Sequence, residues 1–182
     1  FALPGGQIVI FTGLIKKSQK AEEVAGVLAH EIAHVTERHG IDRLVQSVGL
    51  MAMVQLAVGD ASGLLALGSQ LMTIAAINSY SRDQEREADA IGVKMLHDAG
   101  ISHIHLSNFF RGLEEADAED DQNPTQLSEQ VEEVLSWAST HPAVDERVEA
   151  IDELQASLPP LLAKPLDIDW AAVQQALKEG NP

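Results

Sequence analysis

The sequence predicts an α+β domain that is mainly helical and has a small β-sheet edge at its N-terminus. Apolar residues recur at helical spacing through most of the 182 residues, in stretches bounded by Ser, Asp, Gly or Pro. Only residues 7–12 have the composition of a strand, and a Pro-Gly-Gly turn precedes them. The length is sufficient for one domain with a substantial hydrophobic core.

The first long helix carries the most informative motif of the chain. It is expected to start after Ser18, its N-cap, and to stop at Gly40, roughly 20 residues in all. Within it, His30-Glu31-Ile32-Ala33-His34 is an H-E-x-x-H motif, and residues four apart share a helix face. Two imidazoles at that spacing can bind one zinc ion while the carboxylate of Glu31 faces the water that the ion activates. The alternative is a chance match with two packed or solvated histidines, and the helical context favours the metal site.

A third protein ligand is expected from a later helix, predicted over residues 84–99. One face of this helix carries two acidic and two small residues: Glu85, Asp89, Ala88 and Gly92. The small residues would let another helix approach closely, so that Glu85 reaches the metal. Asp89 could then accept a hydrogen bond from the far nitrogen of a ligand histidine. Glu87 is the rival ligand but points to a different side, and an ordinary charged helix face is the alternative for the whole stretch.

Residues 41–79 are apolar and rich in small residues, and they predict two helices joined by a polar turn at 59–63. Each apolar run is shorter than the 18 or so residues that a membrane span needs. We expect these helices to cover the site or to pack on the core. The alternative is a lid that lies against a membrane, so membrane proximity through residues 41–79 stays open.

Prolines and acidic residues mark the remaining boundaries. A final short helix is expected over 169–178, with Asp169 as its cap, after a proline-containing extended connector. The chain is therefore divided into a main domain, residues 1–157, and a C-terminal appendage, residues 158–182. The mostly acidic run at 114–123 is predicted to be a mobile loop.

Four stretches, in this order along the chain, form a pattern that chance would not easily produce. They are Phe1-Ala2-Leu3-Pro4-Gly5-Gly6, then His30–His34, then Ser81-Arg82-x-x-Glu85-x-x-Ala88-Asp89, then Thr140-His141-Pro142 with Arg147 six residues after the histidine. Over residues 1–151 the chain resembles the M48 family of zinc metallopeptidases. The resemblance implies a zincin-like (gluzincin) metalloprotease domain with one zinc ion per chain. It also implies that the natural protein extends upstream of Phe1 and, by analogy, that it is periplasmic or associated with the cell envelope.

The resemblance assigns roles to the matching residues. The implied zinc ligands are His30, His34 and Glu85. Glu31 is implied as the general base, with His141 and Arg147 near the substrate carbonyl. In some soluble relatives the equivalent of His141 itself occupies the open position of the metal.

The chemistry of peptide hydrolysis is compatible with these roles for His141 and Arg147. Pro142 can begin a helix that covers residues 143–154, which places His141 just before it and Arg147 on its second turn. An imidazole N–H or a guanidinium beside the tetrahedral oxyanion typically lowers its energy by about 3 kcal/mol per donor. Without the family pattern, His141 would be a substitute N-cap and Arg147 would pair with a neighbouring carboxylate in solvent.

The predicted function is that of a zinc-dependent endopeptidase acting on protein or peptide substrates, with protein quality control as the expected context. Substrate backbone is expected to pair with the strand edge at residues 7–12. The alternative is a latent or chaperone-like member of the family whose site is plugged by His141. A zinc hydrolase of non-peptide amides is a third and weaker hypothesis.

Composition excludes several other functions. The net charge of −16 argues against a nucleic-acid partner and disfavours binding to anionic lipid, because both need Lys and Arg. The chain has no cysteine, so neither a disulfide framework nor a Cys-based metal site is available. The other histidines His97, His103 and His105 are expected to be solvent exposed, since residues two apart do not share a helix face.

Overall fold

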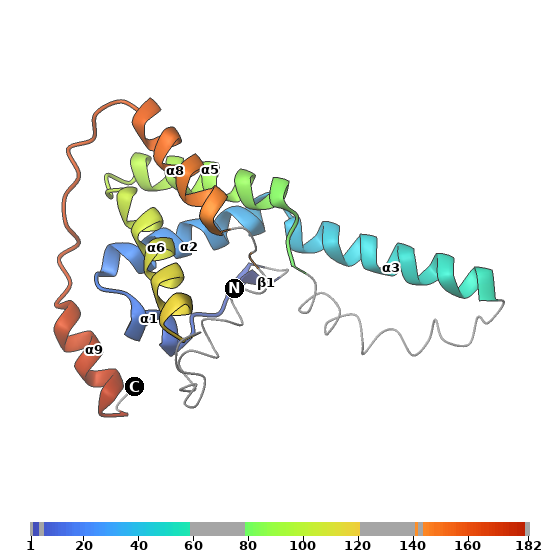
Figure 1. Ribbon diagram of the computed structural model, residues 1–182, viewed down its shortest axis with the longest axis horizontal. Coiled ribbons are helices and arrows are strands. Elements are labelled where there is room, and N and C mark those ends of the chain that lie inside the picture. The colour runs from blue at the N-terminus through green and yellow to red at the C-terminus, as the bar shows by residue number, and fades with distance from the viewer. Residues whose placement is uncertain (1, 4–5, 59–78, 121–140, 142–143, 181–182) are drawn as a thin grey trace.

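The computed structural model describes residues 2–3, 6–58, 79–120, 141 and 144–180. The chain is mainly helical, as predicted, with one short β-ribbon (Figure 1). The elements in order are β1 (Ala2–Leu3), β2 (Gln7–Ile8), α1 (Thr12–Lys17), α2 (Ala21–Thr36), α3 (His39–Val58), α5 (Arg82–Asp98), α6 (Ile104–Asp120), α8 (Val144–Ser157) and α9 (Trp170–Lys178).

The β-ribbon is shorter than the sequence predicts. β1 and β2 pair antiparallel, with Ala2 opposite Ile8 and Leu3 opposite Gln7. The strand predicted over residues 7–12 is wrong beyond Ile8, because Thr12 already begins α1. The helix packs Leu14 against the hydrophobic core.

The boundaries of the motif helix also differ from the prediction. Ser18 ends α1 rather than capping α2, and its hydroxyl donates to the carbonyl of Leu14 at 2.8 Å. α2 starts at Ala21, where the carboxylate of Glu23 accepts the backbone N–H of Gln19 at 2.7 Å. At the other end, Arg38 takes a left-handed φ of 61°. This turn lets α3 begin at His39, so Gly40 lies inside a helix and does not stop one.

The core lies where four helices meet. α2 packs against α5 and α6, and α8 packs against α5 and α6 from the other side (Figure 1). The buried apolar residues of this core are Val27, Ala29, Val93, Leu96, Leu106, Phe109, Phe110, Leu113, Val148 and Ile151. In contrast, α3 extends away from these helices (Figure 1).

Gly92 lies at a close contact between α5 and α2. A Cβ added to it would lie 3.1 Å from the backbone nitrogen of His30 and 3.3 Å from its Cα. The close helix approach that the small residues predict is therefore confirmed, and it occurs at the first histidine of the motif.

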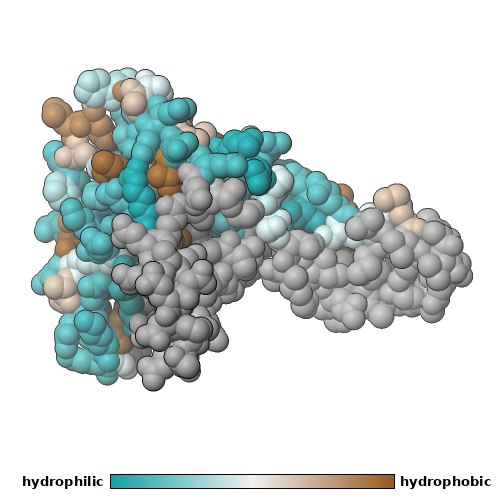
Figure 2. Space-filling view, in the orientation of Figure 1, coloured by the Kyte–Doolittle hydropathy of each residue, from teal (hydrophilic) through white to brown (hydrophobic). Residues whose placement is uncertain are grey.

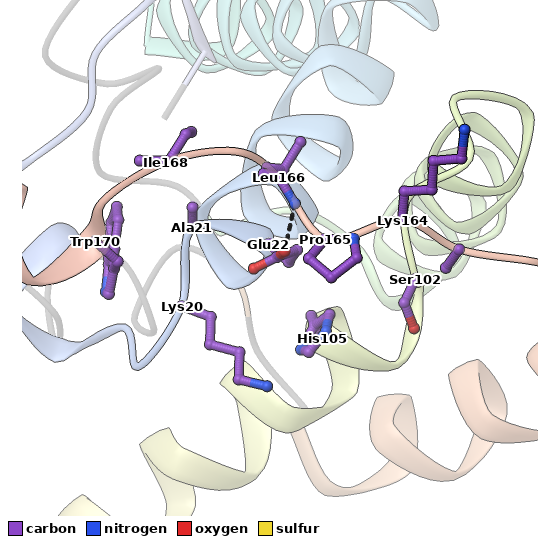
Figure 3. Close-up of a pocket in the computed structure, with 11 residues that line it drawn as sticks. Lys20, Ala21, Glu22, Ser102, His105, Lys164, Pro165, Leu166, Ile168 and Trp170 are labelled. Atoms are coloured by element: carbon purple, nitrogen blue, oxygen red, sulfur yellow. Dashed lines mark hydrogen bonds between the residues drawn. The ribbon is translucent and has the colours of Figure 1, made fainter.

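The C-terminal connector crosses the N-terminal ends of α2 and α6 (Figure 3). The backbone N–H of Leu166 donates to the carboxylate of Glu22 at 2.8 Å, and the indole N–H of Trp170 donates to the carbonyl of Ser18 at 3.1 Å. The predicted cap is confirmed, because Asp169 accepts the N–H of Ala172 at 3.0 Å. A cavity of about 360 Å³ lies under the connector, and its lining includes none of the motif residues.

Two sequence predictions fail on α6 and around its N-terminus. Residues 114–120 of the acidic run belong to α6 rather than to a loop, because Glu and Ala are strong helix formers. His97, His103 and His105 are half-buried rather than exposed, and the rings of the first two stack 5.9 Å apart.

The region predicted to form two helices is described only in part. α3 is the first of them, and the second, like the turn at 59–63, lies outside the described residues. Among the helices that the structure describes, none combines the length and the apolar character that crossing a bilayer requires. On the visible face of the described residues, hydrophilic side chains predominate and apolar ones form small separate groups (Figure 2).

Candidate metal centre

Three separate parts of the chain contribute to one buried cluster. α2 contributes His30, Glu31 and His34, and α5 contributes Glu85 and Asp89. His141, just before α8, and Arg147, within α8, complete the cluster. All seven side chains are buried. The seven residues predicted from the sequence therefore lie together in one buried cluster, and their chemical roles stay predictions.

Four of these residues point potential ligand atoms at one another. The Nε2 of His30 lies 3.0 Å from the Nε2 of His34 and 3.3 Å from the Nδ1 of His141. The Nδ1 of His141 lies 2.9 Å from Oε1 of Glu85. The Nε2 of His30 and the Nε2 of His34 each lie 3.5 Å from a carboxylate oxygen of Glu85.

These separations have the size that a tetrahedral metal site requires. Four ligands at roughly 2.0–2.1 Å from a zinc ion would stand about 3.3 Å from each other. The potential ligand atoms of the four side chains all lie within 4.8 Å of one another, so these side chains could hold one metal ion. The donor set, three imidazoles and one carboxylate, is typical of zinc.

The charges of the cluster also favour a cation. Three buried carboxylates, Glu31, Glu85 and Asp89, share the site with the guanidinium of Arg147. With neutral imidazoles this set has a net charge of minus two. Buried charges are costly unless they are paired or coordinate a metal, and a divalent cation would neutralise this set.

The pKa shifts follow from the same arrangement. Burial lowers the pKa of His34, and the neighbouring His30 and His141 lower it further, so this imidazole stays neutral, the form that binds metals. Burial alone would raise the pKa of Glu31, but its hydrogen bond to His141 and the charge of that ring outweigh burial and hold the pKa well below its usual range. Burial disfavours the charged form of His141, yet the carboxylates of Glu85 and Glu31 raise its pKa.

Arg147 holds two of the carboxylates in place. Its Nε and Nη2 donate to the two oxygens of Asp89, both at 2.7 Å, and its Nη1 lies 2.6 Å from Oε2 of Glu85. The face of its guanidinium lies 4.5 Å over the ring of Phe110. Burial would raise the pKa of Asp89, but the hydrogen bonds from Arg147 and His30 lower it below its usual range. Bidentate pairs of this kind fix orientation as well as charge.

Asp89 in turn orients the first motif histidine. Its Oδ1 lies 2.8 Å from the Nδ1 of His30. A carboxylate only accepts, so the Nδ1 of His30 carries the hydrogen and its Nε2 presents a lone pair to the cluster. This is the contact that the four-residue spacing of Glu85 and Asp89 predicts.

A further group of residues surrounds His34, and sequence reasoning missed it. The ring of Tyr80 stacks on the imidazole of His34, with ring centroids 3.8 Å apart. The guanidinium of Arg43 lies 4.1 Å from the centroid of the Tyr80 ring. His39 places its Nδ1 2.9 Å from the Nδ1 of His34, and its Nε2 lies 3.3 Å from the carboxylate of Glu87. Glu87, the rival third ligand, therefore contacts His39 rather than the four converging side chains, and its side chain is 56% exposed.

The start of α5 fixes where its acidic residues lie. The hydroxyl of Ser81 accepts the N–H of Gln84 at 3.2 Å, and the side chain of Gln84 accepts the N–H of Ser81 at 3.1 Å. This capping box sets the first turn of the helix, and Glu85 is the next residue. The signal was available in the sequence as Ser-x-x-Gln.

Comparison with known proteins gives one consistent result. The family described as Peptidase family M48 matches residues 1–155. A "Putative beta-barrel assembly-enhancing protease" of Vibrio cholerae is 32% identical over 94% of this chain and 35% of its own length. The "Mitochondrial metalloendopeptidase OMA1" of Schizosaccharomyces pombe is 29% identical over 84% of this chain and 42% of its own length.

These relatives are much longer than the region they share with the chain. The "Beta-barrel assembly-enhancing protease" of Escherichia coli K12 is 32% identical over 62% of this chain, which corresponds to 25% of that protein. The chain thus spans about a quarter to two fifths of the length of these relatives. The family match, which covers more than half of the chain and all of the cluster, shows that the chain belongs to peptidase family M48.

Proposed function

We propose that the chain is a zinc-dependent endopeptidase that hydrolyses peptide bonds of protein substrates. The observation that carries the proposal is the set of four buried side chains whose potential ligand atoms all lie within 4.8 Å of one another, with the carboxylate of Glu31 3.4 Å from the ring of His141. Zinc is the metal that imidazole and carboxylate donors at tetrahedral spacing favour. The names of the three relatives, each a protease or a metalloendopeptidase, support the same reaction class.

His30, His34 and Glu85 would be the permanent ligands. When bound, the zinc ion supplies Lewis acidity that polarises the scissile carbonyl and acidifies the attacking water. Glu31 accepts the proton of that water and passes it to the leaving amine, and its lowered pKa keeps it ionised for the first of these steps. Asp89 holds His30 in the tautomer that keeps a lone pair on Nε2.

His141 has two candidate roles, which correspond to two states of one site. A catalytic zinc site has three protein ligands and one open position, whereas here His141 lies where a fourth ligand would be. We infer that this is a resting arrangement in which His141 occupies the position of the substrate carbonyl. This observation keeps the latent or chaperone-like function as the second candidate. In the active arrangement His141 would move aside and donate to the oxyanion.

The contacts of Arg147 indicate a different role from the one that the resemblance implies. Three of its nitrogen atoms are engaged by Asp89 and Glu85. We therefore propose that it stabilises the carboxylates in the resting arrangement, and that contact with the oxyanion would require it to release one of them.

The first test compares cleavage of an unstructured protein by the native chain, Glu31→Gln and Glu37→Gln. Glu37 is an exposed acid at the end of the same helix and serves as the control. We expect Glu31→Gln to lose at least about 100-fold in kcat/KM with its zinc content unchanged, as expected for loss of a general base. Equal activity of the native chain and Glu31→Gln would contradict the proposal.

The second test separates the two roles of His141. If His141 only plugs the site, His141→Ala should cleave faster than the native chain when zinc is saturating. If it also donates to the oxyanion, kcat should fall by roughly 10²–10³. A zinc content that stays at one per chain in His141→Ala would assign the remaining three side chains as sufficient ligands.

Substrate, location and domain limits belong to the proposal as well. We propose that extended substrate pairs with the β1–β2 ribbon, which contacts α2. We retain a role in protein quality control and a cell-envelope location, and fractionation of the producing cells tests the location. We also retain residues 1–157 as the peptidase domain and 158–182 as its appendage.

A further inference from the structure

We propose that His39 and Glu87 form a hydrogen-bond chain that fixes the tautomer of His34 and so keeps its Nε2 ready for the metal. The inference rests on the proposed metal site and adds two positioning residues to it. Neither residue belongs to the four converging side chains.

The carboxylate of Glu87, at the end of the hydrogen-bond chain away from the metal site, determines the direction of each hydrogen bond. The carboxylate of Glu87 can only accept, so the Nε2 of His39, 3.3 Å away, carries a hydrogen. In a neutral imidazole the other nitrogen is then an acceptor, and the Nδ1 of His39 lies 2.9 Å from the Nδ1 of His34. The Nδ1 of His34 must therefore be the donor. Its Nε2 is left with a lone pair, and this atom faces the other ligand atoms.

The opposite order would remove a metal ligand. If His39 carried its hydrogen on Nδ1, it would donate to His34, whose own hydrogen would then be on Nε2 and point into the cluster. A protonated Nε2 has no lone pair for a metal. The carboxylate of Glu87 disfavours this arrangement of hydrogens, because it needs a hydrogen on the Nε2 of His39. Asp89 fixes the tautomer of His30 in the same way, by direct contact with its Nδ1.

The surroundings of His34 leave its ring little freedom to adopt another orientation. Tyr80 stacks on one face with an interplanar angle of 24°, and His39 is itself buried. The left-handed turn at Arg38 brings His39 back toward His34, although the two are five residues apart and would not share a helix face in one continuous helix. The hydrogen-bond chain thus draws His34 from α2, His39 from the start of α3 and Glu87 from α5.

The test measures the zinc dissociation constant by competition with a chelator. His39→Leu, which cannot hydrogen bond, should bind zinc about 10- to 100-fold more weakly than the native protein, as outer partners of metal ligands usually do. His39→Gln has one acceptor and one donor at similar positions and should recover most of the loss. Glu87→Ala, a change at an exposed residue, should give a smaller loss, and Asp42→Ala, one turn further along the surface of α3, should give none.

The tautomers can also be read directly. In the zinc-loaded native protein, histidine ¹⁵N spectra near neutral pH should show the hydrogen on Nδ1 of His34 and on Nε2 of His39. Unchanged zinc affinity in both His39→Leu and Glu87→Ala would overturn the inference, as would a hydrogen on Nδ1 of His39. If His39→Leu does not fold, Glu87→Ala and the spectra decide alone. Failure of the native protein to bind zinc would instead overturn the proposed function.

Discussion

Replacing Gly92 by alanine would place a methyl group against the backbone of α2 at the first histidine of the cluster. The new carbon would meet three backbone atoms, the nitrogen and Cα of His30 at 3.1 and 3.3 Å and the carbonyl carbon of Ala29 at 3.4 Å. Backbone atoms of a helix cannot turn aside as a flexible side chain can. α5 would therefore have to move away from α2 by a few tenths of an ångström.

Two effects of this movement can be estimated. Overpacking a tight contact typically costs about 1–3 kcal/mol, and alanine returns roughly 0.5–1 kcal/mol of helix propensity relative to glycine. The movement also separates Glu85 on α5 from the histidines on α2, and metal sites tolerate only about 0.2 Å of error in ligand distance. We expect a net loss of about 0–2.5 kcal/mol in the free energy of unfolding and a weaker zinc affinity.

Two other glycines provide matched controls. Nothing lies within 4 Å of a Cβ added to Gly112 on α6, so Gly112→Ala should stabilise the protein by roughly 0.5–1 kcal/mol without changing zinc affinity. A Cβ on Gly26 would meet the backbone of Leu106 at 3.1 Å, which strains the contact of α2 with α6 but not with α5. Gly26→Ala should therefore lose stability while zinc affinity changes less than in Gly92→Ala.

The assays are urea unfolding of the metal-free proteins and chelator competition for zinc. If Gly92→Ala were as stable as Gly112→Ala, the close packing of α5 on α2 would be refuted. If Gly92→Ala lost stability but bound zinc as tightly as the native protein, the packing would stand. The step from helix separation to ligand geometry would then be wrong.

Three further outcomes follow from the contacts of the site and of the connector. Asp89→Asn should weaken zinc binding about 10- to 100-fold in chelator competition, because the amide loses the charge that holds Arg147 and His30, and unchanged affinity would exclude this role. Arg147→Lys should lower the free energy of unfolding by about 1.5–3 kcal/mol in urea, since lysine cannot form the bidentate contact. Burial would raise the pKa of Glu22, but the N–H of Leu166 helps to lower it below its usual range. The anchoring of the connector should then be complete above the ordinary carboxyl pKa and lost as the pH falls through the lowered value. The amide shift of Leu166 should follow that titration in the native chain and not in Glu22→Gln.

The sequence was sufficient for the parts of the site that depend on local spacing. His30 and His34 are four apart on one helix, and Glu85 and Asp89 are four apart on another, so helical geometry alone puts each pair on one face. The small residue Gly92 then indicated where the two helices touch. The convergence of His141 on this pair came from the family resemblance, because nothing in its own surroundings relates it to residues more than 50 positions away.

The sequence was not sufficient where the backbone takes an exceptional conformation. Arg38 has a left-handed φ although it is not a glycine, and Gly40 is helical although glycine usually marks an end. Reading Gly40 as the stop placed His39 at the end of a helix and hid its contact with His34. Tyr80 could not be identified either, since its stacking on His34 depends on how the segment before α5 returns to α2.

The two outer carboxylates show why α5 controls the geometry of the whole cluster. Glu87 and Asp89 are two residues apart, so they point to nearly opposite sides of α5, one exposed and one buried. Asp89 reaches His30 directly, whereas Glu87 reaches His34 only because His39 lies between them. α5 thus provides the ligand Glu85 and also fixes the tautomers of the two ligand imidazoles, His30 and His34. Removing Glu87 would disturb one imidazole, and removing Asp89 would disturb His30 and Arg147, whereas moving α5 away from α2 at Gly92 would disturb all three ligands together.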